Sequence, residues 1–241
     1  MAQTLIFGVG GIGRCLAQRL AARGTPIHLI GRSSEKVSAL ATELKAPFSI
    51  VDCSQPEEVE ALTQRLAAAG PLKGLVYAVG SIPLKPLKGT SAKDFLEAYN
   101  LNFLSAALAV KAAAPALCAE GGSAVLFSTV ACAQGFPNHA AIAAAKGALE
   151  AFSRSAAAEY APRMRVNVIA PSLTDTPLAS RMTSSEGMRK ALGDAHPMGR
   201  LGTAADSAAM AEFLLDSKWS GWVTGGLFPV DGGRSSLRPK N

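Results

Sequence analysis

Short apolar runs alternate with longer helical patterns along the whole chain. Seven of these runs are four or five residues long and apolar on both faces, which is typical of parallel strands covered by helices on both sides. They lie at residues 4–7, 27–30, 48–51, 74–78, 124–127, 166–169 and 227–230. Strands that alternate with helices predict right-handed βαβ units. We therefore expect residues 1–241 to form a single domain of the α/β class, a doubly wound parallel sheet of about seven strands.

Two of the intervening helices carry start signals. Ser54 is followed by Pro56 and then Glu57, so we expect Ser54 to be the N-cap of the helix after the third strand. Thr203, with Asp206 three residues later, predicts a second N-cap in the same way.

The segment 172–202 departs from this alternation, because it contains no predicted strand and is rich in turn formers: Pro177, Gly187, Gly193, Pro197 and Gly199. Long irregular connections in compact domains are usually functional. Ligands of doubly wound sheets bind at the carboxyl ends of the strands, and this segment follows the strand 166–169. We expect it to be a lid over the substrate.

A glycine-rich loop follows the first predicted strand. Gly8, Gly10 and Gly13 match the pattern G-x-G-x-x-G, and Ile12 begins the apolar stripe of the next helix. Such glycines let the backbone approach a pyrophosphate, which then accepts hydrogen bonds from the free N–H groups of the helix N-terminus. The pattern predicts a dinucleotide site formed by Gly8, Gly10, Gly11, Ile12 and Gly13. The alternative is a tight turn without a ligand.

The end of the second strand bears on which dinucleotide binds. NAD-selective sites place Asp or Glu there to accept from the ribose 2′-OH, whereas this chain has Arg32 followed by Ser33. A guanidinium pairs well with a 2′-phosphate, so we expect NADP(H) rather than NAD(H), unless Arg32 is an ordinary surface residue. Asp52, at the end of the third strand, is placed either to reach the adenine end or to cap the following helix.

Composition narrows the function classes. With 49% hydrophobic and 17% charged residues, the chain can bury a sizeable core. Its net charge of +6 fits either a mildly basic protein or a preference for anionic ligands. No basic run with interleaved aromatics predicts nucleic-acid binding, and the tail residues Arg234, Arg238 and Lys240 are expected to be solvated. The cysteine and histidine spacing predicts no metal site, and we expect a cytoplasmic protein without a signal peptide or membrane span.

Several ordered motifs besides the glycine loop resemble those of the short-chain dehydrogenase/reductase family, over essentially the whole chain. They are Val51-Asp52, Ala78-Val79-Gly80, Asn102, Ser128-Thr129, Lys146, the run 165–171 that ends in Pro171, Thr176, and the runs 199–202, 223–225 and 230–233.

The resemblance implies a Rossmann-type sheet, NAD(P) binding and often a tetramer. It implies that Asn102 supports a proton-relay water, that Ser128 or Thr129 orients the substrate, and that Lys146 holds the nicotinamide ribose. The remaining matched positions are expected on the cofactor side: Asp52, Cys53, Ala78, Gly80, Pro171 and Thr176. The apolar helical stretches 106–118 and 140–158 also favour a homo-oligomer, a tetramer or a dimer.

The chain departs from the family at the catalytic acid. The tyrosine of Tyr-x-x-x-Lys is replaced by Ile142, four residues before Lys146, and the glycine of Pro-Gly by Ser172. Hydride addition to a carbonyl leaves an alkoxide that needs a proton, and an isoleucine cannot donate one. His139, seven residues before Lys146, lies near the same helix face and is a possible substitute donor, or else a simple first-turn residue.

Three functions remain open on the sequence. The first is an NADP(H)-dependent reductase of a small carbonyl or activated double bond with altered proton-donor chemistry. The second is a non-redox NADP(H)-binding protein, such as a sensor or pseudoenzyme, and the third is a lyase or isomerase on the same scaffold. We favour the first, because Asn102, Lys146 and Thr176 all remain on the nicotinamide side.

Overall fold

The computed structural model describes residues 1–238 and is built around one parallel sheet, so Lys240 lies outside the described residues. Seven strands are hydrogen-bonded in the order β3-β2-β1-β4-β5-β6-β9. They are β1 (Gln3–Phe7), β2 (Ile27–Gly31), β3 (Phe48–Ile50), β4 (Leu72–Tyr77), β5 (Ser123–Phe127), β6 (Arg165–Pro171) and β9 (Leu227–Val230). Every neighbouring pair is parallel. The predicted single-domain, doubly wound fold and its seven strands are confirmed.

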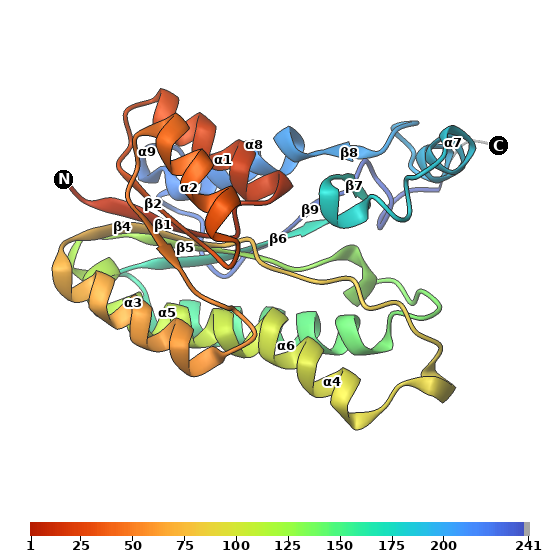
Figure 1. Ribbon diagram of the computed structural model, residues 1–241, viewed down its shortest axis with the longest axis horizontal. Helices are drawn as coiled ribbons and strands as arrows, with labels where there is room; N and C mark the ends of the chain where they lie inside the picture. Colours follow the sequence, from red (N-terminus) through yellow and green to blue (C-terminus); the bar gives the residue numbers. More distant parts are fainter. Residues whose placement is uncertain (239–241) are drawn as a thin grey trace.

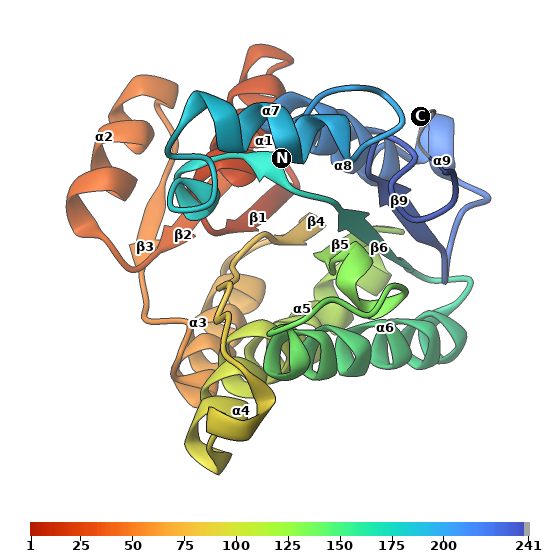
Figure 2. The same ribbon diagram turned by 90° about the vertical axis from the view of Figure 1, so that its right-hand side faces the viewer.

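Helices cover both faces of this sheet (Figures 1 and 2). One layer holds α1 (Gly11–Ala22), α2 (Ser34–Leu44), α8 (Ala204–Leu215) and α9 (Ser217–Ser220). The other holds α3 (Pro56–Ala69), α4 (Ala92–Tyr99), α5 (Ser105–Ala119) and α6 (Ala140–Tyr160). Short 3₁₀ turns lie at Leu87–Gly89, Val130–Cys132 and Pro177–Ala179, and a π-helical turn at Asn100–Leu104 joins α4 to α5.

Two apolar clusters, one on each face, hold the layers together. The central strands are buried along their whole length, as in β5, because helices contact both of their faces. The edge strands differ from the sequence expectation of two buried faces. Phe48 and Ile50 on β3 are 43% and 45% exposed, and Leu227 on β9 is 38% exposed, because an edge strand has a neighbour on one side only.

The structure corrects two further expectations. Residues 172–202 were expected to lack strands, but β7 (Thr174–Asp175) pairs with β8 (Gly202–Thr203) and joins the two ends of the segment. Between them lies α7 (Glu186–Asp194), beyond the carboxyl edge of the sheet (Figure 1). The N-cap of α3 is Gln55 rather than Ser54, because Pro56 already occupies the first turn. Thr203 caps α8 with Asp206 in a capping box, as predicted.

One helical stretch, Ala92–Ala119, is long and apolar enough to cross a membrane by length and composition alone. Half of its most apolar window is buried inside the protein, where Ala109, Val110 and Leu117 belong to the core. Its apolar character is therefore explained by packing under the sheet.

Candidate active site

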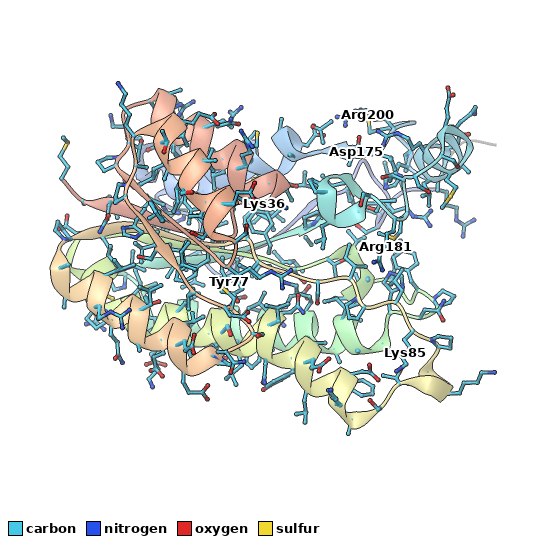
Figure 3. The ribbon with its side chains drawn as sticks, in the orientation of Figure 1. Lys36, Tyr77, Lys85, Asp175, Arg181 and Arg200 are labelled. Carbon is cyan, nitrogen blue, oxygen red and sulfur yellow. The ribbon has the colours of Figure 1, made fainter. Side chains whose placement is uncertain are left out.

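A cavity of about 370 Å³ opens at the carboxyl edge of the sheet. The segments that leave β4, β5 and β6 form its floor, the start of α6 forms one wall, and the segment 172–202 covers it. In Figure 3, Asp175 and Lys85 mark the two sides of this edge, and Tyr77 lies in the interior behind it. Of the predicted site residues, nine line the cavity: Ile12, Ala78, Gly80, Ser128, Thr129, His139, Lys146, Pro171 and Thr176.

In the glycine loop, Gly8 lies close to Gly13 and to Ala78, the residue after β4. Gly8 has φ of +92°, and a Cβ there would lie 2.8 Å from the carbonyl carbon of Ala78. A Cβ at Gly13 would lie 1.8 Å from the Gly8 carbonyl oxygen. Both positions therefore require glycine.

The helix that follows the loop offers an anion site. No side chain caps α1 at Gly10, and its first turn has no acidic residue, so its first N–H groups are open to a ligand. Thr176 lies over this turn, since a Cβ at Gly11 would be 2.5 Å from its methyl carbon. The loop, the open helix end and the adjoining cavity fit the pyrophosphate and nicotinamide of a dinucleotide.

The adenine side lies outside the cavity. Arg32 is exposed at the end of β2, and Ser33 accepts a hydrogen bond from the Lys36 amide (3.4 Å) as the N-cap of α2. Asp52 accepts from the Ser54 amide (3.0 Å), so its carboxylate shapes the turn before α3. Cys53 is 4% exposed, and burial raises the pKa of its thiol to about 12. These four residues are adjacent at the ends of β2 and β3.

The side chains of Lys146 and Asn102 both lie close to Gly80. A Cβ at Gly80 would lie 3.2 Å from Asn102 Oδ1 and 3.9 Å from Lys146 Nζ. Asn102 is fully buried in the π-helical turn, donates to Ala98 O and Ser81 Oγ, and accepts from the Ser81 amide. Lys146 Nζ donates to the Phe127 carbonyl at 2.6 Å. Burial lowers the pKa of Lys146 to about 8, against a smaller opposing effect of Cys132.

Ser128 is committed to a carboxylate that the sequence analysis did not single out. Its Oγ donates to Glu150 Oε1 at 2.5 Å and lies 3.6 Å from Cys132 Sγ. Burial raises the pKa of the Cys132 thiol to about 11. Thr129 accepts from the Ala131 amide (3.3 Å) and caps the 3₁₀ turn that follows β5. Neither hydroxyl is bonded to a histidine.

Ile142 occupies the position one turn before Lys146, as the sequence predicts, and it is 4% exposed and lines the cavity. His139 also lines the cavity, at the N-terminus of α6, where its Nδ1 is 2.7 Å from the Pro137 carbonyl and its ring lies against Phe136. The site therefore has the apolar side chain of Ile142 at the position where the family's Tyr-x-x-x-Lys motif has a tyrosine hydroxyl.

The lid brings in polar groups that the motifs did not predict. Ser172 Oγ lies 2.8 Å from His196 Nε2, and both side chains line the cavity. The only sequence signal was the serine after Pro171. Of the methionines in the lid, Met182 lines the cavity, whereas Met188 and Met198 are exposed.

Arg234 corrects the expectation of a solvated tail. It is half-buried, donates to the Ala195 carbonyl at 2.8 Å and lies 5.7 Å from the centre of the Phe136 ring. It lines the cavity, and with Lys146 it gives the lining two cations and no carboxylate. Within residues 1–238, no group of three or more His, Cys, Asp or Glu side chains could hold a metal ion.

The sequence resembles known proteins over most of its length. A family model described as enoyl-(acyl carrier protein) reductase matches residues 8–235. A 3-oxoacyl-(acyl-carrier-protein) reductase of Mus musculus is 32% identical over 230 residues, which cover 94% of this chain and 94% of that protein. A 2,5-dichloro-2,5-cyclohexadiene-1,4-diol dehydrogenase of Sphingobium indicum is 33% identical over 239 residues, covering 95% of each.

Solved structures resemble this chain in fold over nearly its whole length. A short-chain type dehydrogenase/reductase from Mycobacterium ulcerans superposes with a TM-score of 0.91 at 27% identity, covering 100% of this chain and 92% of that one. A structure described as an NAD(P) dependent gluconate 5-dehydrogenase from Beutenbergia cavernae, with NADP bound at low occupancy, has a TM-score of 0.93 at 27% identity. It covers 98% of this chain and 97% of its own.

Proposed function

Because this chain belongs to the short-chain dehydrogenase/reductase family, whose members bind NAD(P), we propose that it is an NADP(H)-dependent reductase with an altered proton donor. Its substrate is a small carbonyl compound or an activated double bond. The observation that carries the proposal is the pairing of an intact nicotinamide side with Ile142 at the acid position.

The residues that would hold the cofactor are described from its adenine end to its nicotinamide end. Arg32 and Ser33 take the 2′-phosphate, with Asp52 and Cys53 beside the adenine, and the start of α1 takes the pyrophosphate. Ala78, Gly80, Lys146, Pro171 and Thr176 line the cavity and would hold the nicotinamide riboside. When bound, the nicotinamide supplies a hydride to the substrate.

The protein's own groups bind and protonate the substrate. The lid 172–202 covers the cavity and excludes water. The Ser128 hydrogen is given to Glu150, whereas Thr129 only accepts from the Ala131 amide, so the Thr129 hydroxyl is the one that orients the substrate oxygen. Asn102 holds the loop at Gly80 and Ser81 through three hydrogen bonds to Ser81 and Ala98. The cavity offers two histidines, His139 and His196, that could carry the proton that Ile142 cannot supply.

The test is NADPH oxidation against a panel of ketones, enones and imines, run on the parent protein and on Ile142→Tyr. A hydroxyl beside the Lys146 ammonium adds a proton donor at the acid position, so it should raise ketone reduction, with the contribution of general acid catalysis, about 10²–10⁴-fold, as the upper limit. Ile142→Phe is the matched control, because it adds the same ring without a donor.

Three outcomes decide the proposal. A parent protein that reduces simple ketones as fast as Ile142→Tyr would show that the acid position is not limiting. Tight NADPH binding without turnover of any compound, even in Ile142→Tyr, would favour a non-redox sensor. Turnover of a substrate without NADPH oxidation would favour a lyase or isomerase.

A further inference from the structure

Ser172 and His196 form a hydrogen-bonded pair at the base of the lid. Ser172 follows β6 directly, at the carboxyl edge of the sheet, and His196 follows α7. His196 is 4% exposed, with its Nε2 2.8 Å from Ser172 Oγ and its Nδ1 2.7 Å from the Leu192 carbonyl oxygen. Both ring nitrogens therefore have a fixed partner, and the imidazole is held in one orientation.

These partners determine where the protons lie. A carbonyl oxygen only accepts, so Nδ1 of His196 carries a hydrogen in every protonation state. In the neutral ring, Nε2 must then accept the Ser172 hydroxyl hydrogen. In the imidazolium, Nε2 donates to Ser172 Oγ, and the hydroxyl hydrogen is free to point into the cavity. Protonation of the ring thus converts Ser172 into a donor towards the substrate.

Charged groups of both signs lie around His196. Asp231 faces it from the segment after β9, and although burial opposes ionisation, hydrogen bonds from Ser235 and Gly233 and the proximity of His196 keep the pKa of Asp231 low. On the other side, the Arg234 guanidinium is tied to the Ala195 carbonyl. Asp194, near His196 in the chain, is paired with Lys190 at the surface. The Asp231 carboxylate is thus the group placed to balance a charge on the ring.

The other hydroxyls of the cavity lack this arrangement. Ser128 gives its hydrogen to Glu150, Thr174 to the Ser172 carbonyl, and Thr176 to the Thr174 carbonyl. Ser81 and Thr129 accept from amide groups, and among the described residues neither is bonded to a titratable side chain. Of the hydroxyls that line the cavity, and among the described residues, Ser172 is the one hydrogen-bonded to an imidazole.

We propose that Ser172 is the proton donor of the reductase and that His196 reloads it, a role that rests on the proposed reductase function. The substrate gains a hydride at carbon, and its anionic oxygen or carbon takes the Ser172 hydroxyl proton. As that O–H bond breaks, the imidazolium N–H of His196 passes its proton to Ser172 Oγ. The neutral His196 is then reprotonated from water, so one hydride and one proton are consumed in each turnover.

Ser172→Ala and His196→Gln test the two roles. Ser172→Ala removes the donor and should lower kcat for NADPH-dependent reduction by about 10²–10⁴-fold while leaving NADPH binding intact. His196→Gln keeps a hydrogen-bond partner for Ser172 but cannot carry a proton. It should lower kcat and also abolish the fall in rate with rising pH that a histidine acid imposes between pH 5 and 8.

Two matched variants serve as controls. Ser180→Ala removes an exposed hydroxyl from the same lid segment, outside the cavity lining, and should behave as the parent. His139→Gln removes the other cavity histidine and should leave the pH profile in place. A profile lost in His139→Gln but kept in His196→Gln would overturn the proposal in favour of His139. A limb near pH 8 that survives in both would overturn it in favour of Lys146.

A second measurement needs no turnover. Nitrogen-15 NMR of the imidazole in the parent protein should show neutral His196 as the tautomer with hydrogen on Nδ1, and Ser172→Ala should change the chemical shift of Nε2, which loses its hydrogen-bond partner. Hydrogen on Nε2 in the neutral ring would overturn the proposed direction of transfer. If substrates are reduced but Ser172→Ala and His196→Gln both keep the parent's rate and pH profile, the proposal fails and the reductase function stands. If no compound is reduced by any variant, the reductase function itself fails.

Discussion

At the scale of single residues, we expect Arg32 to select NADPH over NADH. Its guanidinium is exposed beside Ser33, and among the described residues it has no carboxylate partner. Charge-assisted hydrogen bonds are worth about 1.5–3 kcal/mol, so Arg32→Ala should weaken NADPH binding by about 10- to 100-fold. NADH affinity should stay nearly unchanged.

Fluorescence titration of both cofactors measures this effect, with Arg65→Ala on α3 as a control for general loss of positive charge. Equal affinities for NADPH and NADH in the parent protein would contradict the assignment of the 2′-phosphate to Arg32.

Lys146 links stability to pH. Its pKa is about 8 in the folded chain against 10.5 for an ordinary lysine, so between these values the unfolded chain binds the extra proton. The free energy of unfolding should therefore rise with pH relative to Lys146→Met. At about 1.36 kcal/mol per pKa unit, the gain from pH 8 to 9.5 is about 2 kcal/mol.

Urea denaturation of the parent protein and of Lys146→Met at pH 8 and 9.5 measures this change in unfolding free energy. Subtracting the two proteins removes the contribution of the titratable groups that both contain. Lys88→Met, which removes an exposed lysine of the 3₁₀ turn after β4, should keep the parent's pH dependence. A Lys146→Met variant with that same dependence would show that the lysine titrates normally.

Sequence motifs indicated the geometry of the glycine loop and the place of Lys146 on α6 more directly than the contacts made by the lid. Gly8, Gly13, Gly80 and Lys146 were predicted because their constraints are local: a turn, a close approach, or a fixed spacing on one helix. The pair of Ser172 and His196 joins residues 24 apart in sequence, and it forms only when the lid folds back over β6. No spacing rule indicates such a contact.

At the scale of elements, α1 and α8 are joined by a buried carboxylate. Glu212 on α8 is 5% exposed and pairs with Arg19 (2.6 Å) and Arg23 (2.5 Å), both from the end of α1. The Arg23 contact is an ion pair without hydrogen-bond geometry. Replacing both arginines by methionine leaves a buried charge unpaired, which should cost about 3 kcal/mol of unfolding free energy.

Glu212→Gln added to the double variant should recover much of that loss, since an amide needs no cation. Arg14→Met breaks the exposed pair with Glu43 and should cost less than about 1 kcal/mol. Chemical denaturation of the set measures both. If Glu212→Gln deepens the loss in the double variant, the carboxylate is not the source of the cost.

Strands were easier to predict than the elements of the lid. The central runs are continuous apolar stretches, and β5 is buried along its whole length. A short run that is apolar at every position is typical of a strand buried on both faces. β7 and β8 are two residues each and have no pattern of their own, because their pairing is set by the path of the lid. Gln55 displaced Ser54 as N-cap because Pro56 fixes the start of α3.

At the scale of the whole molecule, two apolar surfaces predict a tetramer. Leu96 and Tyr99 are 61% and 40% exposed on α4, and the Tyr99 ring lies tilted against that of Phe103 in the π-helical turn, with 4.8 Å between the ring centres. On the segment from α9 to β9, Trp219 and Trp222 are 73% and 101% exposed. Exposed apolar patches often mark interfaces. If each of these two surfaces pairs with its own copy, the two pairings together generate a closed tetramer.

Light scattering at micromolar concentration should give four times the chain mass of 24.8 kDa. Trp222→Asp and Tyr99→Asp each break one interface and should each give a dimer, while the double variant should be a monomer. A monomeric parent protein would contradict the expectation.

The cation-only lining of the cavity has a kinetic consequence. With Lys146 and Arg234 at the site, no carboxylate in the lining, and a net charge of +6 on the chain, an approaching anion meets an attractive field. Ions in solution shorten the reach of that field to about 8 Å at physiological ionic strength. Stopped-flow measurements should therefore show NADPH association slowing steeply as salt is added, while its dissociation changes little.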